Sequence, residues 1–261
     1  MPVSTRLTEL LGVRHPILLA PMDVVSDGRL AAAVSQAGGF GMVGGGYGDA
    51  DWLTREMDAA GDARVGVGFI TFSMAKKPGL LELVLERRPP AVMLSFGEVR
   101  PHAEKIRRAG AKLICQVQTL EQAREALEAG ADVLVAAGAE GGGHGVARGT
   151  FALVPAVVDL ARGAVPVVAA GGVADGRGLA AALMLGADGV LVGTRFYATQ
   201  EAARYAEARA AGDFDTAAVI AGEAVDLIAD IPPAAEVVER IAREAEALLA
   251  GASNRHRVAP D

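Results

Sequence analysis

Short apolar runs alternate along the chain with segments in which apolar positions recur at helical spacing. Most of these short runs are apolar at consecutive rather than alternate positions, which is typical of strands buried on both faces of a parallel sheet. We predict eight strands, at His15–Met22, Phe40–Gly44, Val65–Thr71, Ala91–Phe96, Lys112–Val117, Val133–Ala137, Pro166–Ala170 and Gly189–Gly193.

The intervening segments carry helix signals, with Asp, Thr or Pro near the start and Gly just past most of the ends. We predict helices at Asp27–Ala37, Ala50–Ala60, Pro78–Arg88, Pro101–Ala109, Leu120–Ala129, Asp175–Leu185 and Thr199–Ala211. Repeated strand-then-helix units predict an α/β fold, a TIM (β/α)8 barrel. A doubly wound open sheet is the alternative, although such sheets normally use fewer strands.

The pattern changes after the eighth unit. Asp230-Ile231-Pro232-Pro233 interrupts the chain, and Ala234–Ala250 carries an apolar stripe that predicts a helix on the barrel exterior. We therefore expect a barrel over residues 1–212, a C-terminal helical extension over 213–251 and a flexible polar tail over 252–261.

Composition excludes several classes of protein. The chain is 51% hydrophobic, which argues against disorder, and its net charge of −7 argues against nucleic acid or anionic lipid as partner. No run reaches the ~20 apolar residues of a membrane helix, and we see no signal-peptide pattern. A single cysteine, Cys115, fits a reducing compartment, so we expect a cytoplasmic protein.

Glycine is unusually frequent, at 33 of 261 residues, against an average share of about 7%. Its dense clusters follow predicted strands, at Gly44-Gly45-Gly46, Gly141-Gly142-Gly143 and Gly171-Gly172, whereas Gly38-Gly39 ends a helix. The carboxyl-terminal ends of barrel strands form the active site of this fold. Glycine there lets a backbone approach a ligand closely and present N–H groups to it.

The loops after the seventh and eighth strands are the recurrent phosphate site of such barrels. We expect the N–H groups of Gly172, Gly193 and Thr194, with the Thr194 hydroxyl, to hold a phosphate. A flavin phosphate or a sugar phosphate would both fit.

His144 is the strongest catalytic candidate, because it lies in a loop of glycines four residues after Glu140. Histidine titrates near neutral pH and can act as a general base. His15, His102 and His256 lie far from it in sequence without metal-ligand spacing, so we predict no metal site. Cys115, inside a strand, is interpreted as a core residue.

With these motifs in place, the sequence resembles the nitronate monooxygenase family of FMN-dependent barrels. The resemblance rests on PILLAPM (16–22), GGFGMVGGG (38–46), ICQVQ (114–118), EGGGHG (140–145), VVAAGGVADGRG (167–178), GADGVLVGTRF (186–196) and IPPAAE (231–236). It implies oxidation of alkyl nitronates or nitroalkanes with O2 to a carbonyl compound and nitrite.

The resemblance also implies roles for single residues. His144 matches the family's catalytic histidine, which removes the α-proton of a nitroalkane or positions a nitronate already ionised. FMN would contact Ala20, Pro21, Met22, Gly68, Gln118, Ala137, Gly142, Gly143, Gly171, Gly172, Gly193 and Thr194.

This chain departs from the family pattern in three places. Ala137 stands where many members have glutamine, and Gly68 where many have asparagine. The helical segment that covers the substrate side of the flavin is expected to be missing or greatly shortened here, which would open the site to water.

Alternatives therefore stay open. One is a flavin-dependent enoyl-thioester reductase, which would consume NAD(P)H. Another is a shortened FMN-binding barrel with little or no turnover, and a third is a barrel that binds a phosphate without flavin. Apolar exterior helices also allow a homodimer.

Overall fold

The computed structural model describes residues 2–143, 147–202, 211 and 221–251. Eight parallel strands form one sheet in the order β1-β8-β7-β6-β5-β4-β3-β2. They are β1 (Ile17–Leu19), β2 (Met42–Gly44), β3 (Gly66–Ile70), β4 (Ala91–Ser95), β5 (Lys112–Val117), β6 (Val133–Ala137), β7 (Val167–Ala170) and β8 (Gly189–Val192). Phe40 closes the circle, because its N–H donates to the Ile17 carbonyl and its own carbonyl accepts from Leu19. The predicted TIM barrel is confirmed.

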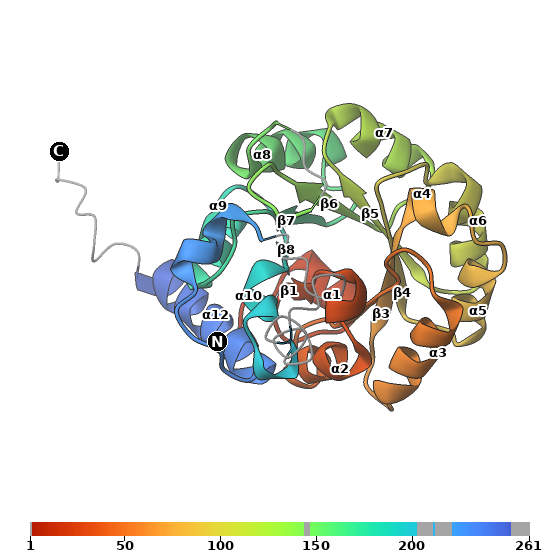
Figure 1. Cartoon of the computed structure of the whole chain (residues 1–261). Coiled ribbons are helices and arrows are strands. Elements are labelled where there is room, and N and C mark those ends of the chain that lie inside the picture. Colours follow the sequence, from red (N-terminus) through yellow and green to blue (C-terminus); the bar gives the residue numbers. More distant parts are fainter. Residues whose placement is uncertain (1, 144–146, 203–210, 212–220, 252–261) are drawn as a thin grey trace.

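Helices surround the barrel (Figure 1). They are α1 (Arg6–Leu11), α2 (Gly28–Gln36), α3 (Ala50–Ala59), α4 (Thr71–Met74), α5 (Leu80–Glu86), α6 (Arg100–Arg108), α7 (Leu120–Glu128), α8 (Thr150–Ala161), α9 (Gly176–Met184), α10 (Thr194–Tyr197) and α12 (Ala234–Gly251), with 3₁₀ turns η1 (Asp23–Val25), η2 (Gln200–Ala202) and η3 (Glu223–Leu227). Seven of the predicted helices are found within two residues of their expected ends. None of the described helices has the length and apolar character needed to cross a bilayer.

Some helices lie where the sequence predicted none. α1 starts at Thr5, whose hydroxyl forms a capping box with Thr8. α8 contains Pro155 in its interior, a residue that normally argues against the middle of a helix. The predicted helix at Thr199–Ala211 lies mostly outside the described residues, and its described start forms the short turn η2.

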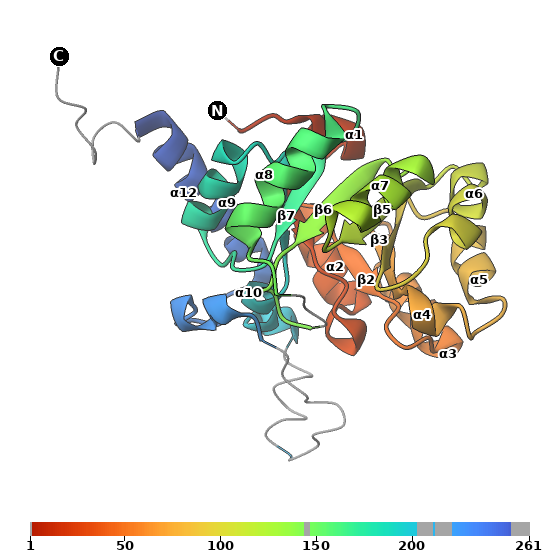
Figure 2. The same ribbon diagram turned by 90° about the horizontal axis from the view of Figure 1, so that it is seen from above.

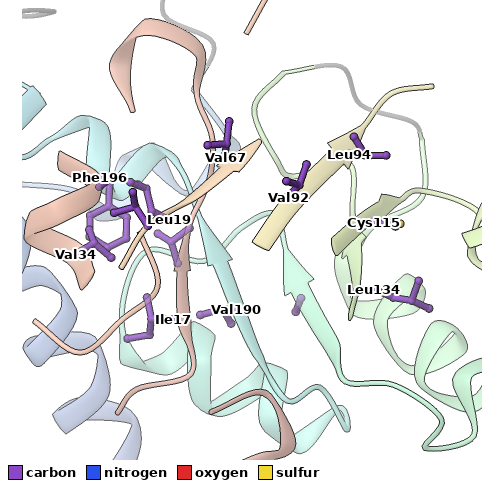
Figure 3. Packing of buried hydrophobic residues seen from close by; sticks show 14 of the residues in the cluster. Ile17, Leu19, Val34, Val67, Val92, Leu94, Cys115, Leu134, Val190 and Phe196 are labelled. Atoms are coloured by element: carbon purple, nitrogen blue, oxygen red, sulfur yellow. The ribbon is translucent and has the colours of Figure 1, made fainter. Parts of the chain in front are cut away.

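The buried side chains form two layers, separated by the strands. Leu18, Met93 and Ile114 belong to an inner cluster that fills the barrel. Their strand neighbours, such as Ile17 and Leu94, belong to an outer cluster shared with the helices, shown in Figure 3. Burial of both faces explains why the strand runs are apolar at consecutive positions.

α1 closes the amino-terminal end of the barrel. Leu7 and Leu11 of this helix join the inner cluster, and Arg6 forms two hydrogen bonds with the Asp188 carboxylate at 2.9 and 2.7 Å. Figure 2 shows α1 and α10 at opposite ends of the barrel. Any cavity within the barrel therefore opens at the carboxyl-terminal end of the strands.

α12 packs on the barrel exterior against α9 and α2. The chain leading to it is fixed by Arg195 of α10, whose side chain is only 5% exposed. Its guanidinium donates to the Asp230 carboxylate (2.8 Å), the Asp230 carbonyl (2.9 Å) and the Ala198 carbonyl (2.8 Å). The second Asp230 carboxylate oxygen accepts from Arg240 of α12 at 2.7 Å.

We expect Arg195→Met to lower the free energy of unfolding by about 3 kcal/mol, because it leaves Asp230 and two carbonyls without their buried partner. Urea denaturation measures the change. Arg108→Met, which removes an exposed ion pair with Glu104, should leave the urea concentration at the midpoint of unfolding nearly unchanged. Equal effects of the two substitutions would contradict an anchoring role for Arg195.

Candidate active site

A cavity of about 380 Å³ lies at the carboxyl-terminal ends of the strands, a size in the range of cofactor sites. Eleven of the twelve residues predicted to contact a cofactor line it: Ala20, Pro21, Met22, Gln118, Ala137, Gly142, Gly143, Gly171, Gly172, Gly193 and Thr194. Gly68 does not, because a Cβ on it would lie 2.2 Å from Pro21 Cγ, so the proline ring covers it. His144 lies outside the described residues.

The loop after β1 is shaped by Ser26, a side chain that sequence reasoning missed. Ser26 is fully buried; its hydroxyl donates to the Ala20 carbonyl at 2.7 Å and accepts from the Met22 N–H at 3.0 Å. These two bonds hold Ala20–Met22 in a tight bend. Pro21 and Met22 are thereby presented to the cavity as one rigid edge.

The loops after β7 and β8 present backbone donors. Gly171 and Gly172 have φ values of 101° and 76°, which favour glycine. Within the described part of the chain, no backbone carbonyl accepts the N–H groups of Gly172, Gly193 or Thr194. Donors that meet no acceptor among the described residues, beside a cavity, form a site suited to an anion.

The β6 loop is closed by a bond between its two ends. Glu140 accepts from the Thr150 N–H at 2.7 Å and from the Thr150 hydroxyl at 2.8 Å. Burial favours the neutral acid, but the hydrogen bonds from Thr150 and from the Glu140 N–H outweigh it and hold the pKa of the Glu140 carboxyl below its ordinary value. The carboxylate also lies at the start of α8, where negative charge is favoured.

Close backbone packing joins this loop to its neighbours. A Cβ on Gly138 would lie 2.2 Å from Thr150 Oγ1, and one on Gly171 would lie 2.9 Å from the Gly141 nitrogen. Gly222, from the chain before α12, contacts the Glu140 carbonyl in the same way, and its N–H donates to Thr194 Oγ1 at 2.9 Å. Only glycine fits at these contacts.

Gly222 and Ala224 also line the cavity, so part of the chain after β8 covers it. The predicted shortening of this cover falls largely on residues outside the described ranges.

Several further lining residues were not predicted. Asp23, Tyr47 and Phe69 line one side, and Ser95 and Gln116 line the strand ends of β4 and β5, with their side-chain oxygens 3.4 Å apart. Asp23 stands directly after the PILLAPM motif and Gln116 inside ICQVQ. Their position at predicted strand ends was the available signal.

The other chemically active groups lie elsewhere. Cys115 is fully buried in the outer cluster, and burial, with a contribution from Asp132, raises the pKa of its thiol to about 12. It is the core residue that the sequence indicated. The described residues contain no cluster of three His, Cys, Asp or Glu side chains that could hold a metal ion. The cavity can therefore supply backbone donors, carboxyl groups and apolar contacts.

Comparison of the sequence with known proteins identifies a family that this chain matches. A family model described as nitronate monooxygenase matches residues 4–65 and 64–211. The chain is 36% identical over 259 residues to the nitronate monooxygenase of Pseudomonas aeruginosa, covering 80% of this chain and 73% of that protein. It is also 36% identical over 205 residues to a Mycobacterium tuberculosis (3aS,4S,5R,7aS)-5-hydroxy-7a-methyl-1-oxo-octahydro-1H-indene-4-carboxyl-CoA dehydrogenase, covering 77% of this chain and 58% of that one.

Solved structures agree. FabK from Thermotoga maritima, in its M276A form, is similar with a TM-score of 0.85 and 30% identity, over 97% of this chain and all of that one. A nitroalkane oxidase from Streptomyces ansochromogenes is similar with a TM-score of 0.78 and 27% sequence identity. The match covers 94% of this chain and all of that one. The chain spans little more than half the length of the Mycobacterium tuberculosis and Rhodococcus jostii dehydrogenases that it matches. By the extent of the family match, this chain belongs to the nitronate monooxygenase family, a family of oxidoreductases.

Proposed function

We propose that this chain is an FMN-dependent oxidoreductase that oxidises alkyl nitronates or nitroalkanes with O2, giving a carbonyl compound and nitrite. The observation that carries the proposal is the cavity at the strand ends, in which the family's sequence motifs supply most of the lining. Membership of the family supports a flavin, and the choice of FMN and of a nitro compound is our inference.

The residues present fit a flavin mononucleotide. The N–H groups of Gly172, Gly193 and Thr194 would hold the phosphate, since they meet no acceptor in the described part of the backbone. Pro21 and Met22, on the rigid edge set by Ser26, would lie against the ring system. When bound, a flavin supplies electron transfer and reaction with O2, whereas the protein supplies orientation and electrostatics.

His144 would act on the substrate from the β6 loop. As a general base it would remove the α-proton of a nitroalkane, or as a donor it would position a nitronate already ionised. Glu140 and Thr150 close the two ends of this loop. Their bond fixes the described ends of the loop that carries the histidine.

A second candidate is an oxidoreductase acting on an acyl thioester with NAD(P)H. The names of the Mycobacterium tuberculosis and Rhodococcus jostii dehydrogenases favour it, because each name describes a carboxyl-CoA compound, which is a thioester, as the substrate. Consumption of NADH or NADPH with an enoyl thioester, in the absence of any nitronate oxidation, would select this candidate.

FMN binding tests the phosphate contacts. We expect the purified protein to retain flavin absorbance after FMN loading and desalting, and to bind FMN at least about 100-fold more tightly than riboflavin, which lacks the phosphate. Thr194→Val should weaken FMN binding about tenfold and leave riboflavin binding unchanged, whereas Thr194→Ser should bind normally. Equal affinity for FMN and riboflavin would contradict the proposed phosphate site.

Turnover tests the histidine. His144→Ala should lower oxidation of a nitronate at least about 100-fold while FMN absorbance is retained, because the anionic substrate loses the group that positions it for reaction. His102→Ala, on α6 away from the cavity, is the matched control and should behave as wild type. Unchanged turnover in His144→Ala would rule out the assigned role.

The stabilisation from the two hydrogen bonds between Thr150 and the Glu140 carboxylate depends on pH, and this dependence can be measured. Because its pKa is lowered in the folded protein, its stabilisation is present at neutral pH and is lost as the pH falls below the ordinary glutamate value of about 4.3. Glu140→Gln should therefore cost about 1 kcal/mol at pH 7, a figure limited by solvent screening, and the difference should shrink as the pH is lowered below the ordinary glutamate value. Glu125→Gln, on the exposed face of α7, should show no such dependence in chemical denaturation.

A further inference from the structure

One glycine cluster is not explained by the phosphate site or the histidine loop. Gly44-Gly45-Gly46 begins at the last residue of β2, and the atoms nearest to a Cβ on each of these glycines belong to Asp23, Gly68 or Phe69 rather than to the predicted phosphate donors. A Cβ on Gly45 would lie 2.6 Å from the Phe69 ring, which accounts for that glycine as a packing contact. The other two glycines both contact Asp23.

Gly44 and Gly46 form a cradle for Asp23. A Cβ on Gly44 would lie 2.3 Å from the Asp23 carbonyl oxygen, and a Cβ on Gly46 would lie 1.5 Å from Asp23 Oδ1. The backbone of Tyr47, at the end of the same loop, lies near enough to the carboxyl to lower its pKa. Gly44, Gly46 and Tyr47 therefore surround the backbone and the side chain of one aspartate.

Asp23 itself is held in an uncommon conformation beside the cavity. Its φ is 46°, one of four positive values among the described non-glycine residues. Two of those four, Asp23 and Phe96, line the cavity. Residues held in sparsely populated conformations cluster at functional sites, and an observed outlier supports a functional hypothesis.

Two described carboxyl groups line the cavity, and they differ in what they are bound to. Glu140 is committed to Thr150 through two hydrogen bonds. Asp23 forms no ion pair with any described Lys, Arg or His. Burial raises the pKa of the Asp23 carboxyl, and the nearby Tyr47 backbone offsets this only in part. A carboxylate that is destabilised by burial is a stronger base than an exposed one.

We propose that Asp23 is a catalytic base of this site, which removes the α-proton from a neutral nitroalkane held in the cavity. The carbon–hydrogen bond breaks and an O–H bond forms on Asp23, while the electron pair moves into the C=N bond of the nitronate and leaves negative charge on the nitro oxygens. The proton afterwards leaves to solvent. The inference rests on the proposed function and assigns His144 the positioning of the nitronate.

A pair of substrates separates this role from a structural one. With Asp23→Asn, oxidation of nitroethane should fall at least about 100-fold, whereas oxidation of preformed ethyl nitronate, which has already lost the proton, should stay within about threefold. FMN absorbance should be retained. Asp62→Asn, on an exposed turn away from the cavity, is the matched control and should oxidise both substrates normally.

A second variant keeps the test independent of the asparagine substitution. Gly46→Ala would place a methyl group where Asp23 Oδ1 lies, so it should displace the carboxyl and give the same selective loss with nitroethane. Titration of the protein labelled with ¹³C at aspartate carboxyl carbons provides a readout without turnover. One resonance, missing in Asp23→Asn, should titrate above the ordinary aspartate value of about 3.9.

Each outcome has a distinct meaning. Equal loss with both substrates would make Asp23 a structural residue, and no loss with either would remove it from the reaction, so either result overturns the inference while the proposed function stands. A resonance that titrates at the ordinary value also contradicts it. Wild-type protein that oxidises neither substrate overturns the proposed function, and the base role fails with it.

Discussion

Backbone packing without side chains, at the carboxyl-terminal end of the barrel, is the constraint on which the rest of the site depends. Gly138, Gly141, Gly171 and Gly222 approach one another or their neighbours so closely that a Cβ would collide with backbone atoms or with Thr150 at several of these contacts. Loops from β6, β7 and the chain before α12 thereby lie in contact around one cavity. Larger residues would force these loops apart, because packed interiors do not accommodate added atoms without backbone shifts.

This packing has a chemical consequence. Beside the cavity, the N–H groups of Gly172, Gly193 and Thr194 meet no backbone acceptor among the described residues, and Gly171 and Gly172 have positive φ values. The donors are fixed before any ligand binds, so little ordering is needed on binding. Beside the β8 loop, the β1 loop presents Pro21, Met22 and Asp23 to the same cavity, on a bend fixed by Ser26. The β7 and β8 loops therefore suit an anion, and the β1 loop next to β8 suits a planar apolar group beside a carboxyl.

Much of the fold could be predicted from sequence, because the strands are buried on both faces and the helix ends carry caps. Lys112–Val117 and Val133–Ala137 were predicted with the bounds that the structure has. α8 was missed because Pro155 interrupts a segment that is apolar on most of its surface. The glycine motifs predicted which loops line the cavity. Gly68 was also predicted to contact the cofactor but does not line the cavity, because Pro21 covers it, which only the structure shows. Ser26, Thr150 and Asp23 act through contacts between segments distant in sequence or through local conformation, which periodicity does not reveal.

A crystal structure of the protein grown with FMN is the most direct test of the central claim, that the glycine loops of β7 and β8 hold a flavin phosphate. We predict electron density for the ring system against Pro21 and Met22, with phosphate oxygens within hydrogen-bond distance of the Gly172 and Gly193 nitrogens. An empty cavity at saturating FMN, or a flavin whose phosphate lies away from both loops, would contradict the account.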